Sequence, residues 1–231
     1  DRLNIMNVLV TIQIMTTGVD YAESVTLRNW EGSALSGQLS PIIQGDKNGV
    51  TNVVIAPSSG NCFTSIAAPN PWVIASLTMR GLAGHCLDAD FGSTIYHWNV
   101  NFGAVGFGFT HITCTWARVE ALRGSLSNGP TGAGSGPYLI SGNASAHINA
   151  VNGVVLTQGN AITATGSPVL TIVASGTNGS YISYSNSTFS GVASGVVTNI
   201  DQLSTILAPV GGWFGSATGQ FTAWDWGASG S

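Results

Sequence analysis

Short runs of alternating apolar and polar residues are the main pattern of this chain. VTIQIM (Val10–Met15) and SVTLRNW (Ser24–Trp30) alternate near the start, and SPIIQG (Ser40–Gly45) and NVVIAP (Asn52–Pro57) continue the pattern. A period of two puts successive side chains on opposite faces of a strand, and no helical pattern accompanies it. The pattern therefore predicts an all-β chain.

A longer repeat joins these runs into units. GVVLTQGNAITATG (Gly153–Gly166) and GSYISYSNSTFSG (Gly179–Gly191) follow one plan, and GSTIYHWNVNFG (Gly92–Gly103) is an earlier version. Each unit has a glycine, a β-rich run, a polar break and a second run that ends in glycine. Units of this kind predict strands that recur in equivalent places along the chain.

The glycines that end such units recur at nearly regular intervals, at Gly81, Gly103, Gly124, Gly142, Gly166 and Gly191. A period in the low twenties, made of β-prone runs, is typical of a solenoid, in which each coil buries its apolar face against the next. Glycine suits the sharp turns between faces, because it readily adopts positive φ. We therefore predict a β-solenoid with coils of about 18–25 residues.

Composition excludes several classes of protein. Charged residues make up only 7% of the chain, against about 25% in typical soluble domains. No apolar run is long enough to span a bilayer, so we expect no membrane insertion. The hydrophobic fraction of 44% argues against disorder. A net charge of −4 without basic clusters argues against nucleic-acid binding.

No metal site or cofactor is predicted. Cys62, Cys86 and Cys114 follow one another at intervals of roughly one coil, without the close C-x-x-C pairs typical of metal sites. We expect three reduced thiols buried in neighbouring coils. The glycine-rich stretch Gly124–Pro137 lacks the Lys-Ser or Lys-Thr of a phosphate loop, and we interpret it as a loop between coils.

The polar residues that are candidates for chemistry lie between the glycines at 81 and 124. Aligning two coils on Gly103 and Gly124 predicts one outward patch of Asp90, His97, His111, Arg118 and Glu120. Alternation along this strand places Tyr96, Trp98, Val100 and Phe102 in the core and turns His97, Asn99 and Asn101 outward. We also expect Val119 and Ile182, on other strands, in the core.

This patch has two interpretations. As a binding surface, its glycan-binding candidates are His97, Asn99, Asn101, His111 and Arg118. As an active site, it would use a pair of carboxyl groups about 5–9.5 Å apart, with Asp88 and Asp90, or Asp90 and Glu120, as weak candidates. A third possibility is that these charges only form surface pairs worth under about 1 kcal/mol. We assign no catalytic residue.

The C-terminal segment is rich in aromatic side chains. GGWFGSATGQFTAWDW carries Trp213, Phe214, Phe221, Trp224 and Trp226. So short a segment cannot bury five large rings by itself, and a solenoid needs its open ends covered. We predict a solenoid over residues 1–208 and a capping tail over 209–231 that packs between subunits. The alternative is a tail that folds back on its own chain.

Several stretches resemble bacteriophage tail fibre and tailspike proteins. These are VTIQIM followed by ESVTLRNW, then SPIIQGD and NVVI, SGNASAHINAVNG, NAITATGSPVL, NSTFSGVASG and GSATGQFT. The resemblance implies a right-handed parallel β-helix, a homotrimer, and assembly in the bacterial cytoplasm into a virion with other phage tail proteins. It also implies contact with host surface polysaccharide, which some members cleave.

We therefore expect a virion structural and adhesive protein that binds host surface glycan. One alternative is a polysaccharide-degrading hydrolase or lyase, and another is a structural fibre or decoration protein without a ligand. The chain lacks the Gly-His-Gly signature of polygalacturonases and has no second paired-acid motif beside Asp88–Asp90. The sequence therefore favours binding over catalysis.

Overall fold

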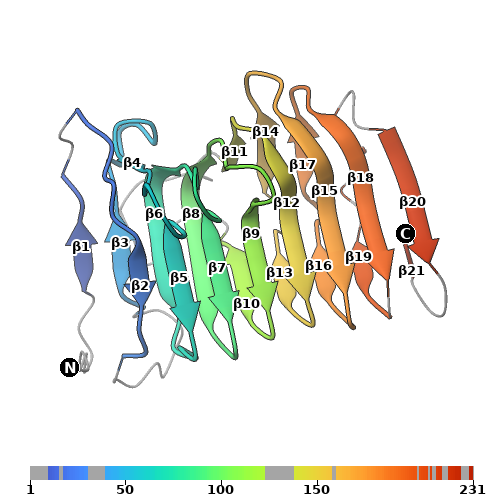
Figure 1. Ribbon diagram of the computed structural model, residues 1–231, viewed down its shortest axis with the longest axis horizontal. Helices are drawn as coiled ribbons and strands as arrows, with labels where there is room; N and C mark the ends of the chain where they lie inside the picture. Colours follow the sequence, from blue (N-terminus) through green and yellow to red (C-terminus); the bar gives the residue numbers. More distant parts are fainter. Residues whose placement is uncertain are drawn as a thin grey trace.

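Parallel β-strands make up the fold. The computed structural model describes residues 10–15, 18–30, 40–122, 138–157, 160–201, 203–207, 209, 212–214, 218–224 and 229–230. Within these residues there is no helix, and hence none that could span a membrane. The strands follow one another along the long axis, with β1 and β20 at opposite ends (Figure 1). The prediction of an all-β chain is confirmed.

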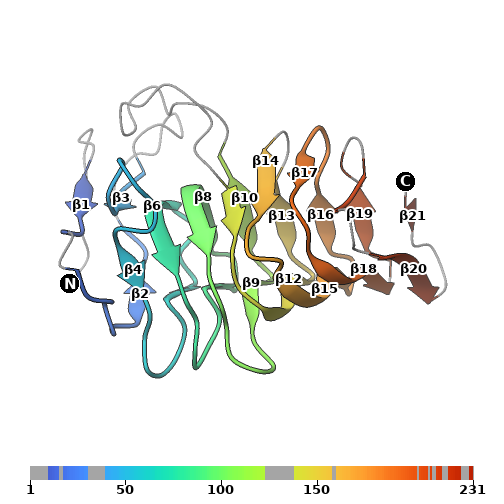
Figure 2. The ribbon, with the colours of Figure 1, turned by 90° about the horizontal axis from the view of Figure 1, so that it is seen from above.

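Two sheets face each other across the core (Figure 2). The eight-stranded sheet contains β2 (Val25–Leu27), β5 (Phe63–Ile66), β7 (Leu87–Asp90), β9 (Thr110–Thr115), β12 (Ala144–Val151), β15 (Val169–Thr177), β18 (Ser194–Asp201) and β20 (Thr218–Trp224). The 13-stranded sheet contains β1 (Thr11–Gln13), β3 (Ile42–Gln44), β4 (Val54–Ile55), β6 (Trp72–Met79), β8 (Thr94–Phe102), β10 (Arg118–Ala121), β11 (Tyr138–Ile140), β13 (Val154–Leu156), β14 (Ala161–Ala164), β16 (Tyr181–Ser183), β17 (Thr188–Ser190), β19 (Thr205–Leu207) and β21 (Ser229–Gly230).

Each strand pairs with its equivalent one pass of the chain later, where a pass runs from one strand of a sheet to its next neighbour. The repeat seen in the sequence is confirmed, because β13 pairs with β16 and β14 with β17. The passes are less regular than predicted: Val73 pairs with Tyr96, but Arg118 pairs with Val154, which makes this pass much longer. This arrangement is consistent with a β-solenoid.

A bend inside β6 and β8 divides the 13-stranded sheet into two branches. β8 pairs with β10 through residues 94–97 and with β11 through residues 100–102. Ser76 and Asn99 lie at the bend with φ of 55° and 51°, and Asn99 Nδ2 donates to Ser76 Oγ at 3.0 Å. A left-handed residue interrupts the alternation of a strand, so the interior positions change parity there.

The change of parity corrects the predicted core. Phe102, Val119 and Ile182 are fully buried, as expected. His97 also faces the interior, because it lies before the bend at Asn99, whereas Phe102 lies after it. Trp98 is buried in a separate cluster, with Ile42, Val73 and Ala75. The expectation that residues 96, 98, 100 and 102 share one face is wrong.

Three cysteines are free and buried, as predicted. Burial raises the pKa of Cys86 well above its usual value and raises the pKa of Cys114 to about 12. The thiols of Cys86 and Cys114 therefore stay protonated, and all three buried cysteines act as small apolar residues.

Glycine is required where one pass touches the next. A Cβ at Gly142 would lie 1.9 Å from the backbone nitrogen of Ala104. At Gly191 the φ is +82°, and a Cβ would lie 2.0 Å from the carbonyl oxygen of Ala164. Both glycines therefore have the close-approach or turning role expected for this series. Gly124 and the glycine-rich stretch 124–137 lie outside the described residues.

The C-terminal aromatic residues divide into two groups. Phe214 is 2% exposed, and its ring centroid lies 4.5 Å from that of Phe189. Trp213 contacts Tyr184 and Phe189, with ring centroids 5.1 and 5.2 Å away. These two residues pack on their own chain, Phe214 fully and Trp213 partly buried, as the alternative of a tail that folds back expects. Packing of the tail between subunits stays a prediction. The side chains of Phe221, Trp224 and Trp226 lie outside the described residues.

A line of polar side chains crosses the apolar interior. His111 Nε2 is 3.0 Å from the carbonyl oxygen of Gly103, which can only accept, so this nitrogen carries the proton. His111 Nδ1 then accepts from His147 Nδ1 at 3.0 Å. His147 Nε2 in turn accepts from the Tyr138 hydroxyl at 2.7 Å. The contacts thus assign one tautomer to each neutral ring.

Burial keeps these histidines neutral. It lowers the pKa of His97 and of His111 to about 3 and lowers that of His147 well below its ordinary value, with the charges of His111 and His97 as smaller causes. His97 also has a buried Nε2 without a hydrogen-bond partner, and its ring stands edge-on to Tyr138. The folded state therefore disfavours protonation at three interior sites.

We predict that acid destabilises the fold through these rings. Since their folded pKa lies below the unfolded value near 6.5, stability is complete above about pH 6.5 and falls as the pH drops towards 3. His97→Leu should reduce the loss between pH 7.5 and 5 by about 2 kcal/mol, because each pH unit below 6.5 costs about 1.4 kcal/mol per buried ring. Urea denaturation at several pH values measures this change.

Tyr138→Phe is the matched control. It leaves His147 Nε2 without its donor, so we expect a loss of about 1–3 kcal/mol that is already present at pH 7.5. A His97→Leu protein with an unchanged dependence of stability on pH would contradict this account of the interior.

Candidate functional site

Two carboxylates point outward from β7 on the eight-stranded sheet. Leu87 and Ala89 are fully buried, so alternation turns Asp88 and Asp90 to the opposite face. The register extends this face into a polar row: Asp88 lies beside Thr64 and Thr113, and the row continues through Asn149, Ser175 and Asn199. The sheet therefore presents amides, hydroxyls and two acids along one side.

Asp88 is held by its neighbours. Thr113 Oγ1 donates to Asp88 Oδ1 at 2.5 Å, and Asn61 Nδ2 donates to Asp88 Oδ2 at 2.6 Å. Asn61 is itself fixed, because its Oδ1 accepts from the backbone N–H of His85 at 2.8 Å. With both oxygens accepting, the carboxylate has a set orientation and can accept further bonds from a ligand hydroxyl.

Asp90 and His85 complete the group of titratable residues. Burial raises the pKa of Asp90, the nearby charge of Asp88 raises it further, and a hydrogen bond from Thr115 opposes both. Burial lowers the pKa of His85, whose Nδ1 accepts from the Thr110 N–H at 3.0 Å. Neither carboxylate forms a salt bridge within the described part of the chain.

Two exposed aromatic residues stand at the end of this strand pair. Phe91 follows Asp90 and is 64% exposed, and Trp116 follows Thr115 and is 59% exposed. They occupy equivalent turns one pass apart, since the Phe91 N–H bonds the Thr115 oxygen and the Gly92 N–H bonds the Trp116 oxygen. The backbones of the two turns therefore lie about 4.8 Å apart along the sheet, and each exposed aromatic residue comes directly after an outward polar residue, Asp90 or Thr115.

The backbone at these two turns is strained. Phe91 and Trp116 have φ of 47° and 53°, a left-handed conformation that is unfavourable for bulky residues. The equivalent turns of later passes carry Asn152 and Asn178, a residue type that tolerates it well. A left-handed conformation at an exposed aromatic residue costs stability, and such strain is typical of functional sites. We call Asp88, Asp90, Phe91, Thr113, Thr115 and Trp116 the corner site.

The structure separates the residues that the sequence grouped into one patch. Asp90 lies beside Thr115, and Glu120 lies beside Tyr96 in the other sheet. A pairing of Asp90 with Glu120 is therefore wrong. The alignment of coils on Gly103 and Gly124 was also wrong, because its shift of 21 residues puts Arg118 beside His97, whereas Arg118 pairs with Thr94.

The glycan-binding candidates are mostly inside the molecule. His97 and His111 are 1% and 0% exposed and cannot contact a glycan in this fold. Asn99 and Asn101 are also buried, and Asn101 Nδ2 donates to Thr78 Oγ1 at 3.2 Å. Arg118 is exposed but forms a salt bridge with Glu120 at 2.7 Å. Asp88 and Asp90 are the two candidates that share one outward face.

Sequence reasoning overlooked Phe91 and Trp116. Each follows a run in which a carboxylate or hydroxyl alternates with buried residues, LDAD before Phe91 and ITCT before Trp116. That position, directly after the last outward polar residue, is the signal that would have located them. Their exposure and backbone conformation depend on the tertiary structure.

Comparison of the chain with protein families, with curated proteins and with solved structures gave no match. Among the described residues there is also no group of three His, Cys, Asp or Glu side chains arranged to hold a metal ion. The function must therefore be argued from the corner site itself.

We predict that Asp88 perturbs the titration of Asp90. Asp88→Asn removes the neighbouring charge, so the pKa of Asp90 should fall towards its ordinary value, as measured by carbon NMR of the labelled carboxyl groups. Thr115→Val is the opposing control, because it removes the hydrogen bond that lowers this pKa and should raise it. An Asp90 pKa that is equal in the wild type and in Asp88→Asn would show that the two groups do not interact.

Proposed function

We propose that this chain is a glycan-binding segment of a phage tail fibre or tailspike, built as a right-handed parallel β-helix. The observation that carries the binding proposal is the strained, exposed pair Phe91 and Trp116 beside Asp88 and Asp90. The phage context rests on the resemblance of the sequence stretches named above. The parallel pairing of successive passes supports the proposed helix.

The chemistry of the corner site suits a sugar. Aromatic rings stack on the apolar faces of pyranose rings, while carboxylates, hydroxyls and amides bond the sugar hydroxyls. Asp88 already accepts from Thr113 and Asn61, so its position is fixed before a ligand arrives. A preorganised acceptor lowers the ordering cost of binding.

The negative charge of the corner site disfavours acidic glycans. The corner site carries two carboxylates that form no salt bridge with any described residue, on a chain of net charge −4. A uronic-acid or sialic-acid polymer would be repelled by these groups. We therefore propose a neutral host surface polysaccharide as the ligand.

Cleavage is the second candidate, supported by the same carboxylates. Asp88 and Asp90 are next-but-one neighbours on one strand face, a separation of about 6.7 Å between Cα atoms. This Cα separation is compatible with a distance between the two carboxyl groups in the range of about 6.5–9.5 Å used by inverting glycosidases. The raised pKa of Asp90 is the direction that a general acid requires.

Assembly into a homotrimer within the virion remains part of the proposal. Phe214 is buried in its own chain and is not available for subunit contacts, whereas Trp213 is only partly buried. The proposed intersubunit residues are therefore Trp213, Phe221, Trp224 and Trp226. A fibre element without any ligand would leave the strain at Phe91 and Trp116 unexplained.

We predict that Trp116→Asn strengthens the fold and weakens glycan binding. Asn occupies the equivalent turn at residue 152, so relief of strain should stabilise the protein by about 1 kcal/mol. Loss of the ring should weaken retention of neutral surface polysaccharide by about tenfold, a change of ~1.4 kcal/mol. Thermal unfolding and affinity electrophoresis measure the two effects.

Asn152→Ala is the matched control, because it changes the same turn one pass away from the aromatic pair. It should leave polysaccharide retention unchanged. Full retention of the polysaccharide by Trp116→Asn, and also by Phe91→Asn, would reject the corner site as the binding surface.

A separate measurement decides between binding and cleavage. If the carboxylates act as acid and base, the wild type shortens the polysaccharide, and Asp90→Asn should slow this by about 10²–10⁴-fold. If they only bind, chain length stays constant and Asp90→Asn costs at most about 1.5–3 kcal/mol of affinity. Size-exclusion chromatography of the polymer over time distinguishes the two outcomes, and Asn152→Ala, outside the corner site, serves again as the control.

A further inference from the structure

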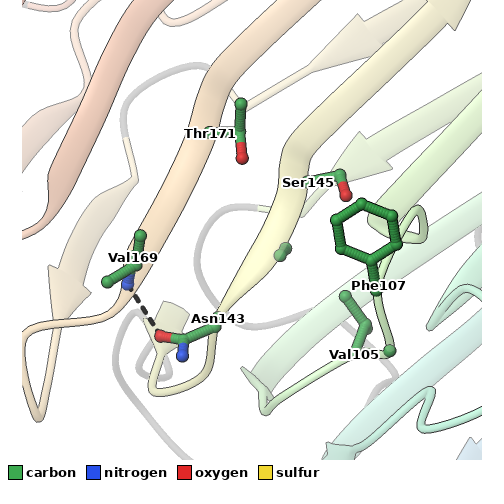
Figure 3. Close-up of a pocket in the computed structure, with 8 residues that line it drawn as sticks. Val105, Phe107, Asn143, Ser145, Val169 and Thr171 are labelled. Atoms are coloured by element: carbon green, nitrogen blue, oxygen red, sulfur yellow. Dashed lines mark hydrogen bonds between the residues drawn. The ribbon is translucent and has the colours of Figure 1, made fainter.

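A pocket lies at the opposite end of the same sheet from the corner site. It is an open pocket of about 270 Å³, formed by the loop before β9 and by the first residues of β12 and β15 (Figure 3). β9 runs from Thr110 to Thr115, so this loop and Trp116 are separated by about 20 Å of strand. The pocket is therefore distinct from the corner site.

An aromatic side chain is presented at the edge of this pocket. Phe107 is fully exposed, yet its loop is well fixed. The Phe109 N–H bonds the Gly106 oxygen at 3.1 Å to close a turn, and the Gly108 N–H bonds Ser145 Oγ at 3.0 Å. A fully exposed ring on an ordered turn is available for a ligand to stack on, and covering it would be favourable.

The remaining lining is polar but uncharged. Figure 3 shows Val105 and Phe107 on one side and Val169 and Thr171 on the other, with Asn143 and Ser145 between them. Asn143 Oδ1 accepts from the Val169 N–H at 2.8 Å, which fixes the amide and leaves its Nδ2 hydrogens to donate. Hydroxyls, one amide and one ring are the groups that recognise a sugar.

We propose that this pocket is a second sugar subsite, for one neutral ring that carries a methyl group, as an acetamido or 6-deoxy sugar does. Val105, Ala144 and Val169 line the pocket with apolar surface that a methyl group can contact, and no lining residue is positively charged, so none can form a salt bridge with a carboxylate. The volume lies below the usual range of about 300–1,000 Å³ for small-molecule sites, which favours a single ring. The inference rests on the proposed glycan-binding function and adds a subsite to it.

The test uses saturation-transfer NMR on the full chain with N-acetylglucosamine and L-rhamnose as probes. Glucose and glucuronate, which lack the methyl group, are the comparison sugars. We expect saturation of the probe methyl groups by the wild type and a loss of about tenfold in Phe107→Ala, as for removal of one aromatic contact. Thr171→Val, which keeps the shape but removes a hydroxyl, should give a smaller loss.

Leu82→Ala is the matched control, because Leu82 is an exposed apolar residue in the neighbouring loop that does not line the pocket. It should bind the probes like the wild type. Methyl saturation that persists in Phe107→Ala, or that is absent from the wild type, overturns the subsite.

These experiments test the corner site and the pocket independently of each other. Trp116→Asn should lose retention of polysaccharide at the corner site and keep the methyl signals of the small probes. If Phe107→Ala retains the probes while Trp116→Asn loses the polysaccharide, the pocket is rejected and the proposed function stands. If the wild type saturates the probes but Trp116→Asn still retains the polysaccharide, the pocket stands and the corner site is rejected.

Discussion

Parallel pairing in register is the constraint on which the rest of this structure depends. The backbone N–H and C=O groups of an inner strand bond alternately to the equivalent strands of the preceding and following passes, so side chains are stacked on their equivalents at about 4.8 Å. An interior row such as Ile95, Val119, Val155 and Ile182 follows directly from this stacking. The outward row through Asp88 also follows from this stacking. Side chains alternate between the two faces of a strand, so the polar residues between the buried ones are stacked on the outer face.

The turns between faces determine which residues this stacking exposes. Left-handed residues occur at equivalent turns, where Asn152 and Asn178 fit the conformation without much strain. Phe91 and Trp116 occupy earlier turns of the same series. They destabilise these turns, because bulky residues disfavour the left-handed conformation, and they expose aromatic surface there. The corner site thus arises where the repeat is violated, next to carboxylates whose positions the repeat itself fixes.

In the interior the repeat is broken by polar residues instead of exposed aromatic ones. Three histidines and Tyr138 occupy positions that apolar residues fill in other passes, as Ile162 does beside Tyr138. Their contacts form a line with one assigned tautomer for each bonded ring, which specifies the packing of β9, β11 and β12 against the bend of β8. Such a line makes the core more specific and also more sensitive to acid.

Local pattern in the sequence was sufficient for the class of fold, because alternation and repeat depend only on neighbouring residues and on the period of the chain. It predicted the β-rich units at 153–166 and 179–191, the buried cysteines and the outward position of Asp90. The sequence pattern could not predict the register between passes, because the length of a pass varies along the chain. The pass that joins β10 to β13 is much longer than the one that joins β6 to β8. The parity change at Asn99, which moved His97 into the core, also depended on the bend that β6 and β8 share. Exposure of Phe91, Trp116 and Phe107 was decided by the tertiary structure alone, because an aromatic residue at a turn is buried or exposed according to what packs over it.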